Sequence, residues 1–421
     1  MSTPSPLHPG VSPESRHWAE RAYAHARSLS VDIGPRPSAG EGEWRAAQYA
    51  ERVMRDAGLD TPHIQDFPAS CSSYRPYAWA VAAGLLAAIV GWRGGRMRSL
   101  FAAVLSLLGA SAFYREATLR DNWARRLSPH GASQNVVAVS QPTAEVRHHV
   151  VLVGHLDTHR TPIFYSSARW LRVLSLSLVG ALASLVGGAA LYGHFARTGC
   201  RRPGWLAIPA ALFQAWALGM LLYADRTPHS PGANDNASGA ATVLALGERL
   251  AREPLRHTQV WVLNTGCEEV GAQGMAAFLD RYGREMWDAD YIDFDMVGVG
   301  EPTLNLTEGL LRRVRYTPGL LRAARLADEG LLGPDHTGGA YTDMWPVITR
   351  GYRGIVLDAR PADSAADLAA NVHWHQLSDT FDKLDCETLA RTHEWAWRLL
   401  QRLDAETVPP DLREGTSTPV G

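Results

Sequence analysis

Four long apolar segments, arranged as two pairs, restrict the folds open to this chain more than any other feature of its sequence. The first pair is Tyr77–Trp92 and Leu100–Tyr114, and neither segment contains a charged side chain. The second pair is Val173–Phe195 and Trp205–Ala224. A helix needs about 20 apolar residues to cross a lipid bilayer, and about 17 is the practical minimum. The second pair reaches this length and the first falls slightly short, so the sequence predicts two inserted transmembrane helical hairpins.

The flanks of the four segments agree with this interpretation. Tryptophan and tyrosine stand at the segment edges, and arginines fill the short connections, as is typical of membrane–water boundaries. These arginines are Arg93, Arg96, Arg98, Arg197, Arg201 and Arg202. Each pair makes an even number of crossings, which returns the chain to the side from which it came. The alternative is four buried helices of a soluble protein.

The side of the membrane on which the rest of the chain lies is predicted from two observations. Arginines also flank the segments away from the short connections, so the usual cytoplasmic excess of positive charge is nearly cancelled. The N-terminal stretch MSTPSPLHPGVSPESRHWAE lacks the basic start and apolar core of a secretory signal. We therefore expect a multi-pass membrane protein whose remaining domain is cytoplasmic.

The sequence outside the hairpins alternates between strand-like and helix-like segments. Without the hairpins, roughly 320 residues remain, a normal size for one domain. Their alternation predicts an α/β fold with a mostly parallel central sheet, covered by helices on both faces. The predicted domain is assembled from residues 15–75, 116–168 and 227–405, with hairpin insertions at residues 76–115 and 169–226. Disordered tails are expected at residues 1–14 and 406–421.

Charge and cysteine content exclude several classes of protein. The formal net charge is −2, and no basic stripe interleaved with aromatic residues is present, so no nucleic-acid partner is expected. The four cysteines lie far apart, which indicates neither a disulfide framework nor a thiolate metal site. They are Cys71, Cys200, Cys267 and Cys386.

Two adjacent carboxylates, Glu268 and Glu269, follow the short apolar run Gln259–Leu263, which reads as a buried parallel strand. Loops at the carboxyl ends of strands in α/β sheets are where ligands bind. Adjacent glutamates repel each other unless a cation or a shared proton relieves them. The stretch therefore predicts a metal or catalytic site, with a solvated acidic loop as the alternative.

A histidine and an aspartate follow another predicted strand. His155 and Asp157 come directly after the sequence VVLVG, and two residues apart on an extended chain point to the same side. His155 is a candidate metal ligand, which Asp157 would orient by accepting a hydrogen bond from the other ring nitrogen. The remaining histidines, including His159 and His336, are interpreted as ordinary surface residues.

Three further segments contain side chains of the types that bind metals. Asp235 lies in the turn-rich sequence GANDNASG just before a helix, where the helix dipole favours an anion, although an ordinary N-cap aspartate is the alternative. Asp293 and Asp295 end a strand, and His373 and His375 flank a tryptophan. Because alternate residues share a side, spacing does not choose between the members of either pair.

Taken in chain order, the candidate residues resemble the M28 family of zinc aminopeptidases: His155, Asp157, Asp235, Glu268, Glu269, Asp295 and His375. The resemblance extends to IGPRPSAGEGEWRAAQYAERVMRDAGL near the N-terminus, to PGANDNASG, to DMVG and to a His-x-x-x-Asp-Thr sequence. It covers nearly the whole chain outside the two hairpins, and the Asp235 loop is its most specific element.

The resemblance implies a pair of zinc ions as cofactors. Asp235 would be shared by both ions, His155 and Asp295 would complete one site, and Glu269 with His375 the other. Nitrogen and carboxylate ligands without a thiolate suit zinc, with Co²⁺ or Mn²⁺ as alternatives.

The resemblance also implies a reaction, the removal of N-terminal residues from peptides. A pair of metal ions about 3.5–4 Å apart binds a water, lowers its pKa and polarises the scissile carbonyl. Glu268 would act as general base and pass the proton to the leaving amine. The implied partner is a peptide with a free N-terminus, beside the lipid bilayer reached through the hairpins.

Two departures from the family pattern concern the second hairpin and the substrate pocket. The second hairpin separates His155-x-Asp157 from Asp235, which a short segment usually connects. A Ser-Asp-His type sequence is expected at the substrate pocket, whereas this chain has Thr342-Asp343-Met344. We expect these three residues at the pocket, with the substrate preference left open.

Four alternative functions stay open at this point. An M20-like deacylase or carboxypeptidase uses a similar order of ligands, but its bridging-aspartate loop differs. A glutaminyl cyclase would use one zinc, whereas both sites here look complete. A catalytically silent membrane receptor or scaffold would lack ligands. A transporter would need polar residues in the hairpins, which offer little beyond Arg172 and Gln214.

Overall fold

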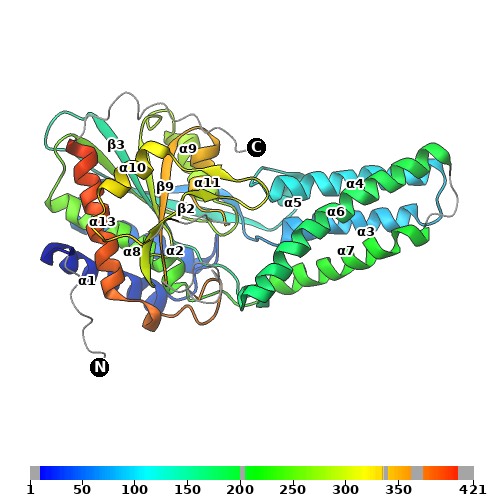
Figure 1. Ribbon diagram of the computed structural model, residues 1–421, viewed down its shortest axis with the longest axis horizontal. Helices are drawn as coiled ribbons and strands as arrows, with labels where there is room; N and C mark the ends of the chain where they lie inside the picture. The colour runs from blue at the N-terminus through cyan, green and yellow to red at the C-terminus, as the bar shows by residue number, and fades with distance from the viewer. Residues whose placement is uncertain (1–9, 200–203, 334, 336–339, 362–372, 406–421) are drawn as a thin grey trace. The chain divides into compact units, whose positions relative to one another are not determined.

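The chain forms two compact units, each built from segments that are separated in the sequence. The computed structural model describes residues 10–199, 204–333, 335, 340–361 and 373–405 (Figure 1). One unit, here called the α/β unit, comprises Met1–Ala69, Gly131–His159 and His229–Gly421. The other, here called the helical unit, comprises Ser70–His130 and Arg160–Pro228.

The α/β unit is built on a mixed sheet. Its described strands pair in the order β1-β2-β4-β3-β5-β9-β6. Their bounds are Asp60–Ser70 for β1, His130–Ser140 for β2, His148–His155 for β3, Thr258–Thr265 for β4, Asp290–Phe294 for β5, Glu301–Leu304 for β6 and Arg353–Arg360 for β9. Strands β4, β3, β5 and β9 run parallel, whereas β2 is antiparallel to β4 and β6 is antiparallel to β9.

The expectation of a mostly parallel sheet therefore holds only for its centre. Residues 141–147 connect β2 to β3, and residues 295–300 connect β5 to β6. A parallel return requires a crossover of about a dozen or more residues, so such short connections reverse the chain direction. The lengths of these connections, rather than the composition of the strands, make the sheet mixed.

The parallel register brings three chain segments to one edge of the sheet. His155 at the end of β3 pairs with Thr265 at the end of β4. On the other side of β3, Val153 pairs with Asp293 of β5. The residues that follow β3, β4 and β5 therefore leave the sheet side by side, at the carboxyl edge where α/β folds bind ligands.

Helices cover both faces of this sheet. The Trp261 ring of β4 contacts the rings of Phe278 and Tyr282 in α9, Gln273–Tyr282. The adjacent Val262 faces Gly247 of α8, Gly239–Arg252. Neighbouring residues of a strand point to opposite faces, so α9 and α8 lie on opposite sides.

Further helices pack on this framework. On the α8 side lie α1 (Pro13–Arg27), α2 (Glu41–Ala57) and α13 (Cys386–Ala405) (Figure 1). On the other side α11 (Met344–Thr349) packs against α9, β5 and β9. The smaller elements are η1 (Ser28–Ile33), η3 (Ala233–Ser238), β7 (Thr307–Glu308), β8 (Val314–Arg315), α10 (Pro318–Leu326) and η5 (Phe381–Lys383).

The helical unit contains two helical hairpins packed together. The long helices are α3 (Arg75–Gly91), α4 (Arg96–Glu116), α6 (Ala168–Thr198) and α7 (Gly204–Ala224), with the short α5 (Trp123–Arg126) and η2 (Ile163–Tyr165). Helix α4 packs on α3 and α6, and α7 packs on the same two helices. A Cβ added at Gly84 would meet the side chains of Leu185 and Gln214 at 2.5 and 2.7 Å, so the small residue permits close helix contact.

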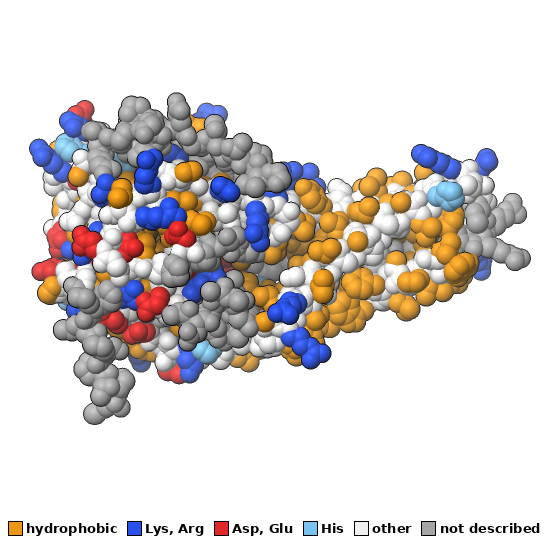
Figure 2. Space-filling view, viewed as in Figure 1, with side chains coloured by type: hydrophobic (Ala, Val, Ile, Leu, Met, Phe, Trp, Pro, Cys, Tyr) orange, Lys and Arg blue, Asp and Glu red, His pale blue; other side chains and the backbone are white. Residues whose placement is uncertain are grey.

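Three of these helices have the length and composition to cross a membrane: α4, α6 and residues Trp205–Ala224 of α7. Helix α3 is apolar but has only 17 residues. Outward-facing side chains are strongly exposed, with Ile89 and Leu176 each at 72%. Figure 2 shows this hydrophobic covering along the helical unit.

Candidate metal centre

His155 faces three carboxylates at the carboxyl edge of the sheet. Its Nε2 atom lies 3.4 Å from Asp235 Oδ1, 3.7 Å from Asp295 Oδ1 and 3.9 Å from Glu268 Oε2. The carboxylates come from three separate loops, after β4, after β5 and before α8. Asp235, Asp295 and Glu268 surround His155 closely enough for one small cation to contact several of them.

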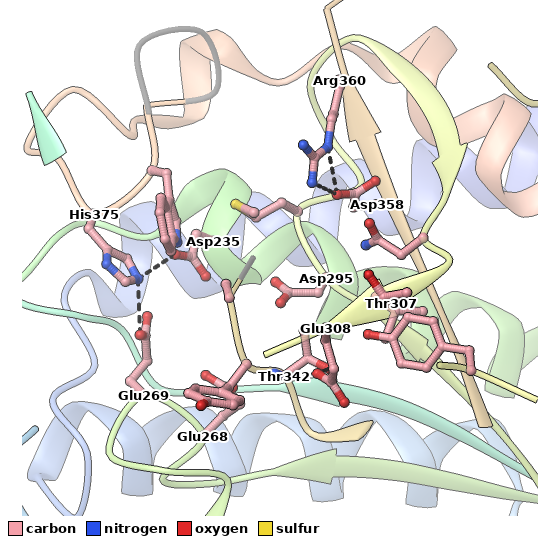
Figure 3. Close-up of a pocket in the computed structure, with 17 residues that line it drawn as sticks. Asp235, Glu268, Glu269, Asp295, Thr307, Glu308, Thr342, Asp358, Arg360 and His375 are labelled. Carbon is pink, nitrogen blue, oxygen red and sulfur yellow. Dashed lines mark hydrogen bonds and ion pairs between the residues drawn. The ribbon is translucent and has the colours of Figure 1, made fainter. Parts of the chain in front are cut away.

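His375 completes the cluster from the opposite side of Asp235 (Figure 3). Its Nε2 atom lies 3.2 Å from Asp235 Oδ2 and 3.1 Å from Glu269 Oε2. The two oxygens of Asp235 therefore face different histidines, Oδ1 toward His155 and Oδ2 toward His375. This is the arrangement of a carboxylate that two neighbouring cations can share.

The electrostatics of the cluster fit a cation. Burial raises the pKa of Glu268, and Glu269 adds to the rise while His155 opposes it. Burial likewise raises the pKa of Asp295. Burial opposes protonation of His155, yet its carboxylate neighbours raise the pKa of its imidazole well above the usual value. Several buried carboxylates around few positive charges are relieved by a divalent ion.

Hydrogen bonding gives a second reason why a metal fits. Asp235 Oδ2 and Asp295 Oδ1 are buried, and among the described residues they face the ring nitrogens of His375 and His155 without a well-aligned hydrogen bond. Buried oxygens without donors cost free energy, which a metal ion would recover. The donor atoms are imidazole nitrogens and carboxylate oxygens, the set that zinc accepts in sites with an open position.

The prediction that His159 is a surface residue is wrong. Its side chain is 6% exposed, and its ring stacks on His375 with centroids 3.7 Å apart and an interplanar angle of 19°. One ring nitrogen of His159 lies within 4.8 Å of ligand atoms of Glu269 and His375. However, a metal lies in the plane of an imidazole that binds it, so two nearly parallel rings are poorly placed to bind the same ion. His159 instead supports His375 from one face, while Trp374 contacts it at a centroid distance of 4.5 Å. His336 lies outside the described residues.

Asp157 positions the loop that carries the two glutamates. Its Oδ1 atom accepts a hydrogen bond from the Glu268 backbone N–H at 3.0 Å, and its Oδ2 from that of Glu269 at 3.1 Å. The Ser38 hydroxyl also donates to Oδ2, at 2.6 Å. His155 Nδ1 lies 3.5 Å from Oδ1, so the same carboxylate also faces the histidine.

The Asp235 loop is held by Asp379 and Arg36. Asp379 accepts hydrogen bonds from the backbone N–H groups of Asn234 and Asp235, at 2.7 and 3.0 Å. Burial raises the pKa of Asp379 to about 7. The fully buried Arg36 donates to the carbonyl oxygens of Pro231 and Gly232, at 3.0 and 2.8 Å. Both side chains fix the backbone just before the shared carboxylate.

Sequence reasoning missed Glu43, a buried carboxylate of α2. It accepts hydrogen bonds from the backbone N–H groups of Cys267 and Ala39 and from the side chains of Ser133 and Gln134. Burial, with Asp157 nearby, raises its pKa to about 8. Glu43 therefore braces the residue next to Glu268. Its only sequence signal is its place within the N-terminal segment of the family resemblance.

The structure also separates the members of the two ambiguous pairs. Asp295 faces His155, whereas Asp293 is buried outside the two candidate metal groups, and burial together with Asp343 raises the pKa of Asp293. His375 enters the cluster, whereas His373 Nδ1 lies 2.9 Å from the Ser378 hydroxyl. Both candidates that the resemblance favours are the ones at the cluster.

The three predicted pocket residues occupy different places. Thr342 lines a cavity beside the cluster. Asp343 is buried and accepts a hydrogen bond from the Thr265 hydroxyl, and Met344 packs beneath Gly354 of β9. Neither Asp343 nor Met344 is among the residues that line this cavity.

The family comparison agrees with this geometry. Residues 222–400 match the family model described as Peptidase family M28. This part of the chain belongs to peptidase family M28. The matched M28 segment contains Asp235, Glu268, Glu269, Asp295 and His375. No curated protein sequence matches the chain.

Solved structures define the fold that the M28 segment shares. A zinc aminopeptidase from Bacillus subtilis has a TM-score of 0.54 at 15% identity, covering 91% of this chain and 94% of its own. An aminopeptidase from Aneurinibacillus sp. strain AM-1 has 0.53 at 14%, with 91% and 95% covered. A glutaminyl cyclase from Porphyromonas gingivalis has 0.51 at 16%, with 91% and 97% covered. The fold is thus common to peptidases and cyclases.

Proposed function

We propose that this chain is a membrane-anchored zinc aminopeptidase that removes N-terminal residues from peptides. The observation that carries the proposal is the position of Asp235, whose two oxygens lie 3.4 and 3.2 Å from two different histidines. Glu268 lies beside this cluster, 3.9 Å from His155 Nε2. It belongs to neither group of close candidate ligands, which are His155 with Asp235 and Asp295, and His159 with Glu269 and His375. The M28 match supports the peptidase class.

The proposed metal ligands divide into two sets that share Asp235. His155 and Asp295 would hold one ion, and Glu269 with His375 the other. Zinc is the proposed metal, with Co²⁺ or Mn²⁺ as substitutes that the same donor atoms accept. When bound, the metal polarises the scissile carbonyl and lowers the pKa of a water.

Glu268 is the proposed general base. Its side chain is 8% exposed, and Asp157 fixes its backbone through the hydrogen bond to the N–H group. In the proposed reaction, Glu268 takes a proton from the attacking water and delivers it to the nitrogen of the leaving amine. Positioned proton transfer of this kind contributes roughly 10²–10⁴-fold in rate.

The same observations bear on three alternatives to the aminopeptidase. A glutaminyl cyclase, the activity of one protein with the same fold, would release ammonia from an N-terminal glutamine and leave the peptide intact. A catalytically silent scaffold would do neither, and the gathering of all seven candidate residues at one edge argues against it. The M28 match also argues against an M20-like deacylase or carboxypeptidase.

Peptides with free and acetylated N-termini test the proposal. We expect the zinc-loaded protein to release single N-terminal residues from free peptides and to refuse the acetylated ones. Glu268→Gln should retain bound zinc, measured by atomic absorption, and lose roughly 10²–10⁴-fold in kcat. Unchanged turnover in this variant, or cleavage of acetylated peptides alone, would contradict the proposed mechanism.

A further inference from the structure

We infer that the cavity beside the metal centre selects peptides with a cationic N-terminal side chain, lysine or arginine, and that Glu308 is the residue that binds it. The inference rests on the proposed aminopeptidase function and names its substrate class. Glu308 lies in β7 and is not one of the candidate metal ligands; Figure 3 shows it on the Asp295 side of the cavity, opposite His375.

The cavity joins the metal centre to Glu308. Asp235, Glu268 and Asp295 line one part of it, and Glu308 and Thr342 line another. A substrate whose scissile bond lies at the metal centre would therefore extend its first side chain toward Glu308. The cavity volume of about 70 Å³ holds roughly five to seven water-sized groups at about 10–15 Å³ each. That volume includes the metal centre, so a side chain directed toward Glu308 would occupy only part of it.

The carboxylate of Glu308 is fixed by one oxygen and open at the other. Its Oε2 atom accepts hydrogen bonds from the Thr342 backbone N–H and hydroxyl, both at 3.0 Å. Its Oε1 atom is buried and meets no well-aligned donor among the described residues, although the carboxyl group also interacts with the hydroxyl of Tyr316, which lines the same cavity. The whole side chain is 1% exposed. A preoriented, buried oxygen that lacks a donor is suited to a ligand that brings one.

Further acceptors in the same wall strengthen the case for a donor-rich ligand. Asn305 Oδ1, on a residue that is 6% exposed, and Thr307 Oγ1 are also buried without a hydrogen-bond partner in the described chain. Both residues line the cavity together with Glu308. An ammonium group carries three donors and a guanidinium five, whereas an aliphatic side chain would leave every one of these oxygens unpaired.

The charge of the wall also favours a cation. Arg360 lines the cavity, but its Nε and Nη2 atoms donate to Asp358 Oδ2 at 2.9 and 2.8 Å, so its charge is compensated within the wall. Glu308 has no basic partner among the described residues, and burial raises its pKa to about 8, as expected for a carboxylate without a cation. An acidic substrate side chain would meet Glu308 without a free arginine to bind it.

Norleucine is the matched control for lysine, because it has the same length and lacks the charge. We expect kcat/KM for lysyl-peptides to exceed that for norleucyl-peptides by roughly 10–100-fold, the effect of one charge-assisted hydrogen bond. Glu308→Gln should remove most of this ratio while turnover of norleucyl-peptides changes by less than about threefold. Glu285→Gln, at an exposed carboxylate, should change neither value. Free L-lysine should also bind the zinc-loaded protein more tightly than L-norleucine in calorimetry.

The outcomes separate this inference from the proposed function. Efficient hydrolysis of norleucyl-peptides with no preference for lysine would overturn the inference and leave the aminopeptidase in place. Equal losses for both peptides in a folded, zinc-loaded Glu308→Gln variant would give Glu308 a structural role only and also overturn it. No hydrolysis of any free peptide would remove the proposed function and the inference together.

Discussion

The carboxylate of Asp157 reaches three segments that lie far apart in the chain. It accepts hydrogen bonds from Ser38 and from the backbone N–H groups of Glu268 and Glu269, and it faces the ring of His155. One side chain therefore positions a proposed metal ligand and the proposed base. Groups that orient metal ligands in this way commonly contribute 10–100-fold in metal affinity or activity.

Asp157→Asn should therefore weaken catalysis without removing the site. The asparagine amide retains one acceptor oxygen, so one of the two backbone N–H groups loses its partner. We expect kcat to fall roughly 10–100-fold, with zinc affinity weakened in a chelator competition. Ser38→Ala, which removes one donor to Asp157 and leaves both of its acceptor oxygens, is the matched control and should have a smaller effect. A kcat within threefold of the original would contradict this role.

At the residue scale, local pattern located the strand ends but not every partner. The sequence alone predicted a metal or catalytic site at His155 and Glu268. The signals were two adjacent glutamates after one strand and a histidine with an aspartate after another. The choice of Asp295 over Asp293 came from the resemblance, because alternation places both on one side. Glu43 was missed because a glutamate in a charged, amphipathic helix reads as solvated, and only tertiary packing buries it.

At the element scale, a polar cluster joins α1 to α8. Glu248 of α8 lies 3.2 Å from His25 Nε2 and 2.5 Å from Arg21 Nη2, both in α1. Burial opposes ionisation of Glu248, but these two partners outweigh it and lower its pKa to about 2. Its stabilising contribution is therefore present above the unfolded pKa near 4.5 and is lost as the pH falls toward 2.

Glu248→Gln should reduce the loss of unfolding free energy that occurs as the pH falls from neutral to acidic values. We expect the variant to lose roughly 1–3 kcal/mol of unfolding free energy at pH 7 and much less near pH 2. Urea unfolding of both proteins across this range measures the difference. Glu20→Gln, at an exposed position of α1, is the control and should leave the curve unchanged. A loss of the same size at pH 2 and pH 7 would contradict the ionic origin.

The positions of strands and helices in the sequence were easier to predict than the pairing of the strands in the sheet. Periodicity placed the strand before Glu268 and the helix after Asp235 close to β4 and α8. The antiparallel pairings of β2 and β6 were not predicted, because they depend on the length of connections rather than on strand composition. The strands around Glu308 are only two residues long and carry too little pattern to recognise.

At the scale of the whole molecule, the helical unit carries the features that suit a membrane protein. Its long helices expose apolar side chains such as Ile89, Leu176 and Leu212 to the surroundings. Burial of such side chains in lipid is worth about 25 cal/mol per Å² of apolar surface. Helix α3, at 17 residues, spans about 26 Å against a hydrocarbon core of about 30 Å, so it would cross with slight local thinning.

Membrane fractionation tests this expectation on the full chain. The protein should sediment with membranes, resist extraction by alkaline carbonate and dissolve in detergent, as expected of a chain anchored by membrane-spanning helices. Protease added outside intact cells should leave the α/β unit uncut, as expected for the cytoplasmic side. A known peripheral protein and a known multi-pass protein are the controls. Release by carbonate would rule out integration, and external cleavage would reverse the orientation.

A hydrogen bond joins the two ends of the chain between which the second hairpin is inserted. The backbone N–H of Ser230 donates to the carbonyl oxygen of His159 at 2.9 Å, so the residues on either side of the insertion are already neighbours within the α/β unit. Closing a loop between adjacent ends costs free energy that grows only slowly with loop length. The hairpin can therefore change in length while His159, Ser230 and the chain leading into Asp235 keep their positions.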